Sequence, residues 1–241
     1  MTSLTTSQID RLGERLRQGI SSEEDLRLLD AYRRTFRSAY ETVVTTLRQK
    51  LAFETTGRPA KTITSIVAKL RREHVRLSQI QDIAGCRLVV PDRPAQAAAI
   101  ERLLKAFPQA RLVDRTQKPS HGYRAVHVIV HLDGKPVEIQ VRTDLQHLWA
   151  QISERLSDLY DPRLKYGCGP AKAVEFLQES SALVRDLEDL EKPLGVTIFY
   201  LAAEQIEAIE RLARQRDELK RRMLDHFQRV LADLDRPGRS G

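Results

Sequence analysis

Apolar residues recur every three or four positions through most of the first fifty residues, a spacing that predicts helix. One helix is predicted over residues 22–51, because Ser22 followed by two acidic residues is typical of a helix N-terminus. The polar segment 54–59, with its Gly and Pro, interrupts the pattern and is expected to be a loop. A shorter helix is predicted over residues 61–73.

Short runs of β-branched residues then replace the helical spacing. Four segments are predicted as strands: 86–91, 111–114, 125–132 and 136–143. A helix is predicted over 95–107, and Asp133-Gly134 is typical of a tight hairpin turn between the last two strands. The predicted fold class is therefore α/β (or α+β), with a mixed sheet flanked by helices.

Helical spacing returns near Gln146. Helices are predicted over about 146–159, 171–190 and 197–234, with a loop over 160–170 and a frayed tail over 235–241. The last helix would be about 57 Å long at 1.5 Å per residue. Its apolar stripe, which includes Ile198 and Leu201, needs a partner surface, so we expect a second copy or another protein to join through these helices.

The chain falls into three segments on this pattern. We expect residues 1–57 to form a helical segment that packs on the core, 58–160 to form the core itself, and 161–241 to form a helical extension.

Charge and cysteine content narrow the class of protein. The net charge of +7, from 40 basic and 33 acidic residues, favours a polyanionic partner such as a nucleotide or a nucleic acid. Cys86 and Cys168 lie far apart and match no metal-ligand spacing, which predicts a reducing compartment without disulfides. The first residues lack the apolar core of a signal peptide, and no apolar run could span a membrane. A cytoplasmic protein is therefore expected.

One predicted helix carries a basic face. Lys61, Ser65, Lys69 and Arg72 are spaced four, four and three residues apart, which places them along one stripe of the helix. Glu73 is the only acidic residue between positions 57 and 81. Such a face fits a phosphate-binding site and an ordinary solvated surface about equally well.

Two acidic residues accompany the predicted sheet. Asp82 comes just before a strand, where an acid is also a common turn residue. Glu138 shares one face of a strand with Gln140 and Arg142, opposite the apolar residues of the same strand. Two carboxylates on one sheet, surrounded by cations, are the groups that Mg²⁺-assisted chemistry on phosphates requires.

Two aromatic side chains lie at the start of the strand that begins near residue 125. Tyr123 could stack on a base, and His127 could act as an acid or base. Taken singly, each is explained as well by an ordinary packing role in the core.

In combination, these residues resemble the synthetase domain of the RelA/SpoT family. The motifs follow one another in the family's order: K-x-x-x-S-x-x-x-K-x-x-R from Lys61, D-I-A-G-x-R from Asp82, K-P-x-x-G-Y-R-x-x-H from Lys118, E-I-Q-x-R-T from Glu138 and W-A at Trp149. The resemblance spans about residues 58–157, and the chain is similar to single-domain small alarmone synthetases and their toxic relatives. No segment resembles the hydrolase domain of the large members.

The resemblance implies a nucleotidyltransferase-like sheet that transfers pyrophosphate from ATP to the 3′-hydroxyl of GDP or GTP, making (p)ppGpp and releasing AMP. It implies Asp82 and Glu138 as catalytic residues and as ligands of Mg²⁺. The residues implied for ATP binding are Arg58, Lys61, Ser65, Lys69, Arg72 and Arg87. The residues implied for acceptor binding are Lys118, Tyr123, His127, Gln140, Arg142 and His147.

The sequence departs from the family pattern in places. Pro59 stands where the family has an Arg that clamps adenine, with Arg58 one position earlier, and the His that commonly follows Trp149 is missing. The acceptor therefore stays open. Toxic members of the family modify the 3′ CCA end of tRNA, a partner that the positive charge also suits. A non-catalytic RNA-binding module is a third reading, against which the two carboxylates argue.

Overall fold

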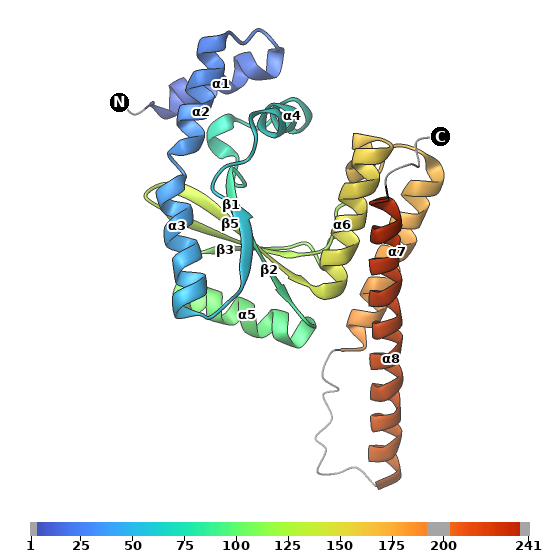
Figure 1. Ribbon diagram of the computed structural model, residues 1–241. Coiled ribbons are helices and arrows are strands. Elements are labelled where there is room, and N and C mark those ends of the chain that lie inside the picture. Colours follow the sequence, from blue (N-terminus) through green and yellow to red (C-terminus); the bar gives the residue numbers. More distant parts are fainter. Residues whose placement is uncertain (1–3, 192–202, 237–241) are drawn as a thin grey trace. The chain divides into compact units, whose positions relative to one another are not determined.

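The structure is a computed structural model that describes residues 4–191 and 203–236 (Figure 1). Its α-helices are α1 (Thr6–Gln18), α2 (Glu23–Arg34), α3 (Arg37–Thr45), α4 (Ile63–Glu73), α5 (Arg93–Ala106), α6 (Asp144–Leu159), α7 (Ala171–Asp189) and α8 (Ala203–Leu234). Its strands are β1 (Thr55–Arg58), β2 (Ala84–Val90), β3 (Arg111–Asp114), β4 (Val126–Leu132) and β5 (Lys135–Thr143). Short helical turns are η1 (Thr46–Lys50), η2 (Leu77–Gln79) and η3 (Pro162–Tyr166).

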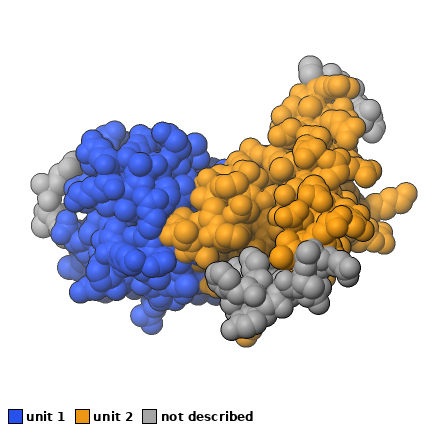
Figure 2. Space-filling model, turned by 90° about the horizontal axis from the view of Figure 1, so that it is seen from below, with its two compact units in different colours: residues 1–88, 100–113, 127–141 blue, residues 89–99, 114–126, 142–241 orange. Residues whose placement is uncertain are grey.

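The chain forms two compact units (Figure 2). Unit 1 consists of residues 1–88, 100–113 and 127–141, and unit 2 of residues 89–99, 114–126 and 142–241. Both units include segments from the middle of the sequence. The division of the chain into the segments 1–57, 58–160 and 161–241 therefore stays a prediction.

The five strands form one sheet in the order β1-β2-β5-β4-β3, with β1 antiparallel to β2. This confirms the predicted fold class, a sheet flanked by helices. The predicted hairpin is also present: Asp133 and Gly134 both have positive φ angles, 49° and 71°, as the favoured two-residue turn between antiparallel strands requires. Along β2, side chains alternate between buried ones such as Cys86 and Leu88 and partly exposed ones such as Arg87.

The expectation of a loop over residues 54–59 is wrong, because Thr55–Arg58 form the edge strand β1. Only Thr55 of this strand is buried, and the other three residues are exposed. An edge strand with polar side chains shows no apolar alternation, so its pairing with β2 through the backbone leaves no pattern in the sequence.

The single helix predicted over residues 22–51 is also wrong, since it is divided into α2, α3 and η1. Ser22 does cap α2, through a bond from the backbone N–H of Asp25. At the break between α2 and α3, the rings of Tyr32 and Phe36 pack edge to face with centroids 5.3 Å apart. Both rings are buried, so the apolar spacing continues through the break and hides it.

The helix predicted from Lys61 begins two residues later, at Ile63. Thr62 is the N-cap and accepts a hydrogen bond from the backbone N–H of Ser65, at 3.2 Å. Threonine is a preferred N-cap because its hydroxyl satisfies a free N–H of the first turn. Lys61 therefore precedes the helix and is not part of the stripe formed by Ser65, Lys69 and Arg72.

Unit 2 is built around α6, α7 and α8, which pack on one another. Their shared core includes Leu145, Trp149, Leu177, Val184 and Phe227. The helices predicted near 146–159 and 171–190 are confirmed as α6 and α7. The predicted start of the last helix, including Ile198 and Leu201, lies outside the described residues, as does most of the tail that was expected to fray.

Candidate functional site

Asp82 of unit 1 lies between two lysine ammonium groups. Lys61 Nζ is 2.7 Å from Asp82 Oδ2, and Lys69 Nζ is 2.9 Å from Asp82 Oδ1. The three side chains are only 16–21% exposed. Each oxygen of the carboxylate thus has its own cationic donor, one from the segment before α4 and one from α4 itself.

This arrangement favours the ionised forms of Asp82 and Lys69. Burial alone would raise the pKa of Asp82, but the charges and hydrogen bonds of Lys61 and Lys69 outweigh it and lower that pKa to about 2. For Lys69, burial lowers the pKa, and the charge and hydrogen bond of Asp82 more than offset that effect, so its pKa is raised. At neutral pH a negative Asp82 therefore lies beside a positive Lys69.

Main-chain contacts fix Lys61 although it lies outside the helix. Its N–H donates to the carbonyl of Ile83 at 2.6 Å, next to Asp82. Its own carbonyl accepts from Arg33 Nε at 2.6 Å, and Arg33 also pairs with Asp30 at 2.7 Å. The sequence analysis did not single out Arg33, because an arginine on an amphipathic helix carries no motif.

Glu138 is the second carboxylate of unit 1, and it lies on β5 with 9% of its surface exposed. His127 Nδ1 is 2.9 Å from its Oε1, and Gln140 Nε2 donates to its Oε2 at 2.7 Å. Burial raises the pKa of Glu138. His127 and Gln140 lower that pKa by more than burial raises it, so the net shift is downward. The negative charge of Asp82 acts to raise the same pKa, so the two carboxylates lie close enough to interact.

Gly85 lets the two site strands approach. A Cβ at this position would lie 3.0 Å from the carbonyl oxygen of Glu138, closer than ordinary van der Waals contact. The D-I-A-G-x-R motif thus brings the strand that follows Asp82 against the backbone of Glu138.

Two ionised carboxylates are a donor set that suits Mg²⁺, which often binds one or two carboxylates and takes its other ligands from phosphates and water. Asp82 and Glu138 are such a pair. Within the part of the chain that the structure describes, no three or more His, Cys, Asp or Glu side chains gather as a self-sufficient metal cage. The residues therefore fit a metal that arrives with a phosphate ligand.

Two arginines share the outer face of β1 and β2. In the antiparallel register, Arg58 is opposite Gly85 and Thr56 is opposite Arg87. Arg58 and Arg87 are therefore diagonal neighbours on one face, a relation that usually separates residues by about 7–8 Å. That spacing leaves room for one planar group between two guanidinium groups. Arg58 thus occupies a position that could compensate for Pro59.

In unit 2, Arg142 and Tyr123 form a stacked pair. Arg142 Nη2 donates to the Tyr123 hydroxyl at 3.0 Å, and the guanidinium carbon is 5.1 Å from the centre of the ring. Arg142 is 3% exposed, whereas Tyr123 is partly exposed and packs beside the Trp149 cluster. The ring therefore has a buried cationic support.

Gly122 is required beside this tyrosine. Its φ is +89°, and a Cβ there would lie 2.7 Å from Cζ2 of Trp149. On the other side of Tyr123, the buried Arg124 donates to the carbonyl of Thr116 at 2.7 Å and to Ser181 Oγ at 3.1 Å. The G-Y-R motif thus fixes the tyrosine from both neighbours.

Comparison with known proteins identifies the middle of the chain. Residues 57–160 match a family model described as "Region found in RelA / SpoT proteins". These residues are similar to a RelA/SpoT region. The resemblance inferred from the motifs is confirmed.

The chain covers less than half the length of the relatives that it matches in sequence. An uncharacterized protein of Mycobacterium tuberculosis is 41% identical over 112 residues, which are 44% of this chain and 41% of that protein. A probable chloroplastic GTP diphosphokinase of Oryza sativa is 32% identical over 95 residues, which are 38% of this chain and 13% of that enzyme.

Among solved structures, the small alarmone synthetase 1 from Bacillus subtilis matches 70% of this chain and 94% of its own, with 26% identity and a TM-score of 0.50. The same protein bound to its product pppGpp matches with a TM-score of 0.51 and also 26% identity. A GTP pyrophosphokinase family protein from Streptococcus pneumoniae, at 22% identity and a TM-score of 0.50, shares the fold.

The predicted site residues, all within residues 57–160, fall in both units. The residues in unit 1 are Arg58, Lys61, Ser65, Lys69, Arg72, Asp82, Arg87, His127, Glu138 and Gln140; those in unit 2 are Lys118, Tyr123, Arg142 and His147. Their individual roles stay predictions.

Within unit 1, the structure brings Lys61, Lys69 and Asp82 together, and it places His127 and Gln140 on Glu138. His127 was expected near the acceptor, and its Nδ1 lies beside Glu138, a carboxylate of the proposed metal site.

Other predicted residues of the RelA/SpoT region have more local contacts. Ser65 accepts a hydrogen bond from the Thr62 hydroxyl at 2.7 Å, and Arg72 pairs with Glu73 at 2.6 Å. Lys118 is exposed in the loop before Tyr123, and His147 lies in the first turns of α6.

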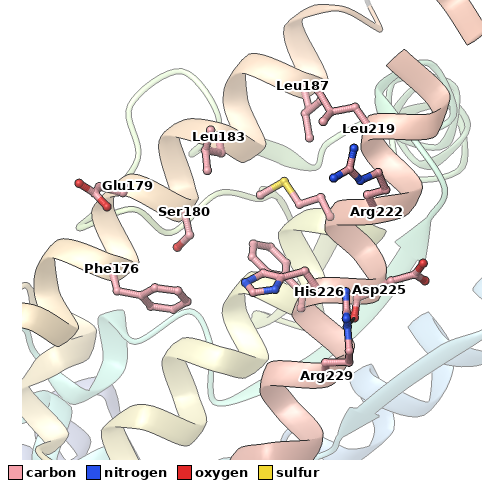
Figure 3. A pocket seen from close by; sticks show the side chains of 12 residues that line it. Phe176, Glu179, Ser180, Leu183, Leu187, Leu219, Arg222, Asp225, His226 and Arg229 are labelled. Carbon is pink, nitrogen blue, oxygen red and sulfur yellow. Dashed lines mark hydrogen bonds between the residues drawn. The ribbon is translucent and has the colours of Figure 1, made fainter. Parts of the chain in front are cut away.

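A separate cavity of about 620 Å³ lies between α7 and α8 (Figure 3). Apolar side chains such as Phe176, Leu183 and Met223 line it, together with the polar side chains of Arg222 and His226. None of its lining residues was predicted as a site residue.

In the described part of the chain, no helix has the length and apolar character that a lipid bilayer requires.

Proposed function

We propose that this chain is a pyrophosphokinase that transfers pyrophosphate from ATP to the 3′-hydroxyl of GDP or GTP and releases AMP. The observation that carries the proposal is the pairing of Asp82 with Lys61 and Lys69, which combines a metal-binding carboxylate with two phosphate-binding cations. Relatives named as GTP diphosphokinase and small alarmone synthetase support the same activity.

On the donor side, the two lysines exchange one anion for another. When ATP binds, Lys61 and Lys69 turn their N–H groups from Asp82 to the phosphate oxygens. The carboxylate oxygens that they leave become available as ligands. Arg58 and Arg87, diagonal neighbours on the sheet face, hold the adenine ring between them by stacking.

Asp82 and Glu138 would hold Mg²⁺, which neutralises charge on the phosphates and polarises the phosphorus that is attacked. Both side chains are suited to this role because their pKa values are lowered, so they are ionised at neutral pH.

On the acceptor side, the ring of Tyr123 stacks on the guanine base, with Arg142 supporting the opposite face of the ring. The 3′-oxygen of the acceptor forms a bond to the β-phosphorus of ATP as the bond from that phosphorus to the AMP oxygen breaks. The hydroxyl proton passes to Glu138. Positioning and charge neutralisation supply most of the rate enhancement, as is usual for phosphoryl transfer.

The test is incubation of the purified chain with γ-labelled ATP and, separately, GDP, GTP or deacylated tRNA. We expect label in the guanosine nucleotide and release of AMP. The Asp82→Asn variant, purified in parallel, controls for a contaminating kinase. Label in tRNA alone would move the acceptor from a nucleotide to RNA, and label in none of the three would contradict the proposal.

A further inference from the structure

Helix α7 of unit 2 carries two polar side chains within its buried face. Ser181 is 3% exposed and Glu188 is 4% exposed. They are seven residues apart, about two helical turns, so they lie on the same side of the helix. Buried polar groups require hydrogen-bond partners. Those partners show which segments of the chain the helix fixes in place.

Ser181 holds the segment that contains Tyr123. Its Oγ donates to the carbonyl of Gly122 at 2.6 Å and accepts from Nε of Arg124 at 3.1 Å. Gly122 and Arg124 are the two neighbours of Tyr123 in sequence. One hydroxyl therefore fixes the backbone before the ring and the side chain after it.

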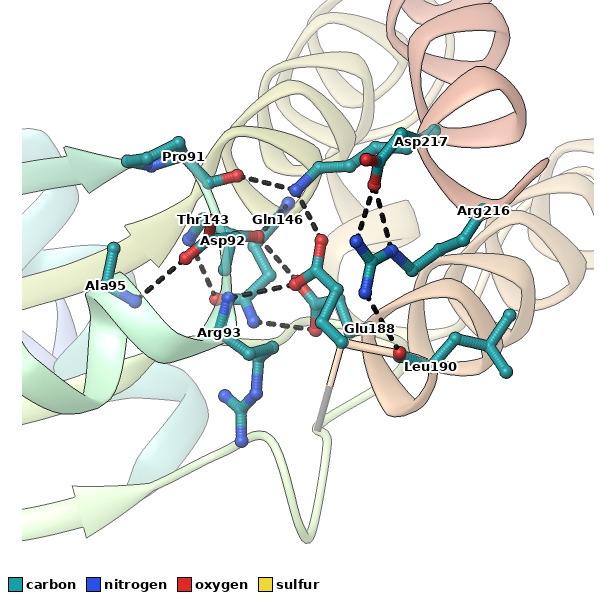
Figure 4. A network of polar contacts seen from close by, with 12 residues as sticks. Pro91, Asp92, Arg93, Ala95, Thr143, Gln146, Glu188, Leu190, Arg216 and Asp217 are labelled. Atoms are coloured by element: carbon teal, nitrogen blue, oxygen red, sulfur yellow. Dashed lines mark hydrogen bonds and ion pairs between the residues drawn. The ribbon is translucent and has the colours of Figure 1, made fainter. Parts of the chain in front are cut away.

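Glu188 holds the segment that follows Arg142 (Figure 4). Its Oε1 accepts from the Thr143 hydroxyl at 2.5 Å, and its Oε2 accepts from Gln146 Nε2 at 2.9 Å. Thr143 and Gln146 form the capping box of α6, and Gln146 also accepts from Gln96 of α5 at 3.0 Å. Glu188 thereby ties the end of β5 and the start of α6 to α7.

These two segments meet in the Arg142–Tyr123 pair. Arg142 directly precedes Thr143, which Glu188 holds, and Tyr123 lies between the two residues that Ser181 holds. The contact between them is a stacking at 5.1 Å and a hydrogen bond at 3.0 Å. Both halves of the pair therefore rest on one face of a single helix.

We propose that α7 positions the acceptor-binding pair, with Ser181 and Glu188 as positioning residues for Tyr123 and Arg142. The inference rests on the proposed function, since it assigns the acceptor base to Tyr123. Loss of either anchor lets the ring and the guanidinium shift apart, which weakens acceptor binding. The donor residues Lys61, Lys69 and Asp82 pair with one another within unit 1, so we expect ATP binding to keep its strength.

The kinetic test compares Ser181→Ala and Glu188→Gln with the wild-type chain. Ser181→Ala removes both hydrogen bonds of the hydroxyl, and Glu188→Gln weakens the two that the carboxylate accepts. For each variant we expect a roughly three- to tenfold rise in the KM for GDP or GTP. The KM for ATP should stay within about twofold. Asp186→Asn is the matched control, because Asp186 is an exposed acid on the same helix that pairs with Arg185. Thr143→Ser, which keeps the hydroxyl that Glu188 accepts from, should retain the acceptor KM, whereas Thr143→Val should raise it.

A second measurement does not depend on activity. Hydrogen exchange of backbone amides should quicken in residues 120–126 for Ser181→Ala and in residues 142–147 for Glu188→Gln, with the amides of α4 unchanged. If the wild-type chain transfers no pyrophosphate, the proposed function fails and this measurement alone decides the positioning role.

Two results would overturn the inference. One is a parallel rise in the KM for ATP and for the acceptor with a lower melting temperature, which indicates a purely structural role. The other is unchanged exchange in both segments, which means that α7 does not hold them.

Discussion

Asp82 in unit 1 and Glu188 in unit 2 are both carboxylates withdrawn from water, yet their pKa values move in opposite directions. Burial raises both. At Asp82, the charges of Lys61 and Lys69 reverse the effect and bring the pKa to about 2. At Glu188, burial prevails over the hydrogen bonds from Thr143 and Gln146, so its pKa lies above the ordinary value.

The difference lies in the donors. A hydroxyl and an amide can donate hydrogen bonds to both oxygens of a carboxylate. Unlike two ammonium groups, they do not offset the free-energy cost of removing its charge from water. A carboxylate with cationic donors stays charged and can exchange those donors for a metal or a phosphate. One with neutral donors serves to connect segments of the fold. Charge is therefore the property that separates the proposed chemistry of unit 1 from the proposed positioning in unit 2.

The largest effect is expected from removing a charged carboxylate. Asp82→Asn and Glu138→Gln should each lower kcat by roughly 10²–10³-fold, the usual loss when one electrostatic contributor to the transition state is removed. Both variants keep the packing volume and should fold, but the melting temperature should fall, because each removes a negative charge that its neighbours stabilise. Glu73→Gln is the matched control: Glu73 also faces Lys69, at 3.7 Å, but is more exposed. Equal losses for Glu73→Gln would mean that the cluster acts only as a surface charge.

Tyr123 provides the next largest effect. Tyr123→Ala should weaken acceptor binding by about 1–3 kcal/mol, the usual worth of stacking between a base and an aromatic ring. Tyr123→Phe keeps the ring but loses the bond from Arg142, so we expect a smaller loss of about 1 kcal/mol. Calorimetric titration with GDP and with a non-hydrolysable ATP analogue measures both. A loss of both ligands together, with a lower melting temperature, would assign Tyr123 to packing.

Replacing a lysine beside Asp82 should raise the pKa of that carboxylate, the direction in which the pKa of Glu188 is shifted. The lowered pKa of Asp82 means that its contribution to stability is fully present above about pH 4 and is lost as the pH falls toward about 2. In Lys69→Ala the pKa of Asp82 rises, so the free energy of unfolding should depend less steeply on pH across that interval. Denaturant titrations at several pH values measure this, with the exposed Lys105→Ala as control. Identical slopes for wild type and Lys69→Ala would show that the ion pair does not hold the charge.

The smallest effect has the opposite sign and concerns Glu188. Because its pKa is raised, the carboxylate destabilises the fold once it is ionised, so stability is lost as the pH rises above its ordinary pKa of 4.5 and through the raised value. Arg93 and Glu191 also act on this pKa, the first lowering it and the second raising it. Glu188→Gln should remove this component and flatten the dependence of the melting temperature on pH above about 4.5. A steeper dependence in the variant would contradict the assignment.

Much of the fold could be predicted because periodicity and turn chemistry are local. The alternation of β2, the Asp133-Gly134 turn and the Ser22 cap all depend on residues near one another in sequence. The errors arose where pairing partners are distant. β1 forms because its backbone pairs with that of β2. No residue within 54–59 indicates this pairing.

The candidate site could be predicted to a similar extent. Motif residues such as Asp82, Lys69 and Glu138 came from the chemistry that their types allow and from the family resemblance. Ser181 and Glu188 were missed, although each falls on the apolar stripe of α7, alongside Leu177 and Val184. A polar residue on such a stripe is a detectable signal, but its partners are unknown until the fold is.

The alternation along β2 has a practical consequence for experiments in solution. Burial raises the pKa of the Cys86 thiol to about 12, and Cys168, in the loop after η3, is exposed. Since the thiolate is the form that attacks a thiol reagent, such reagents should modify Cys168 and leave Cys86 intact. The wild-type sequence therefore offers a single attachment point for a fluorescent or spin label, placed in unit 2, without any cysteine being engineered.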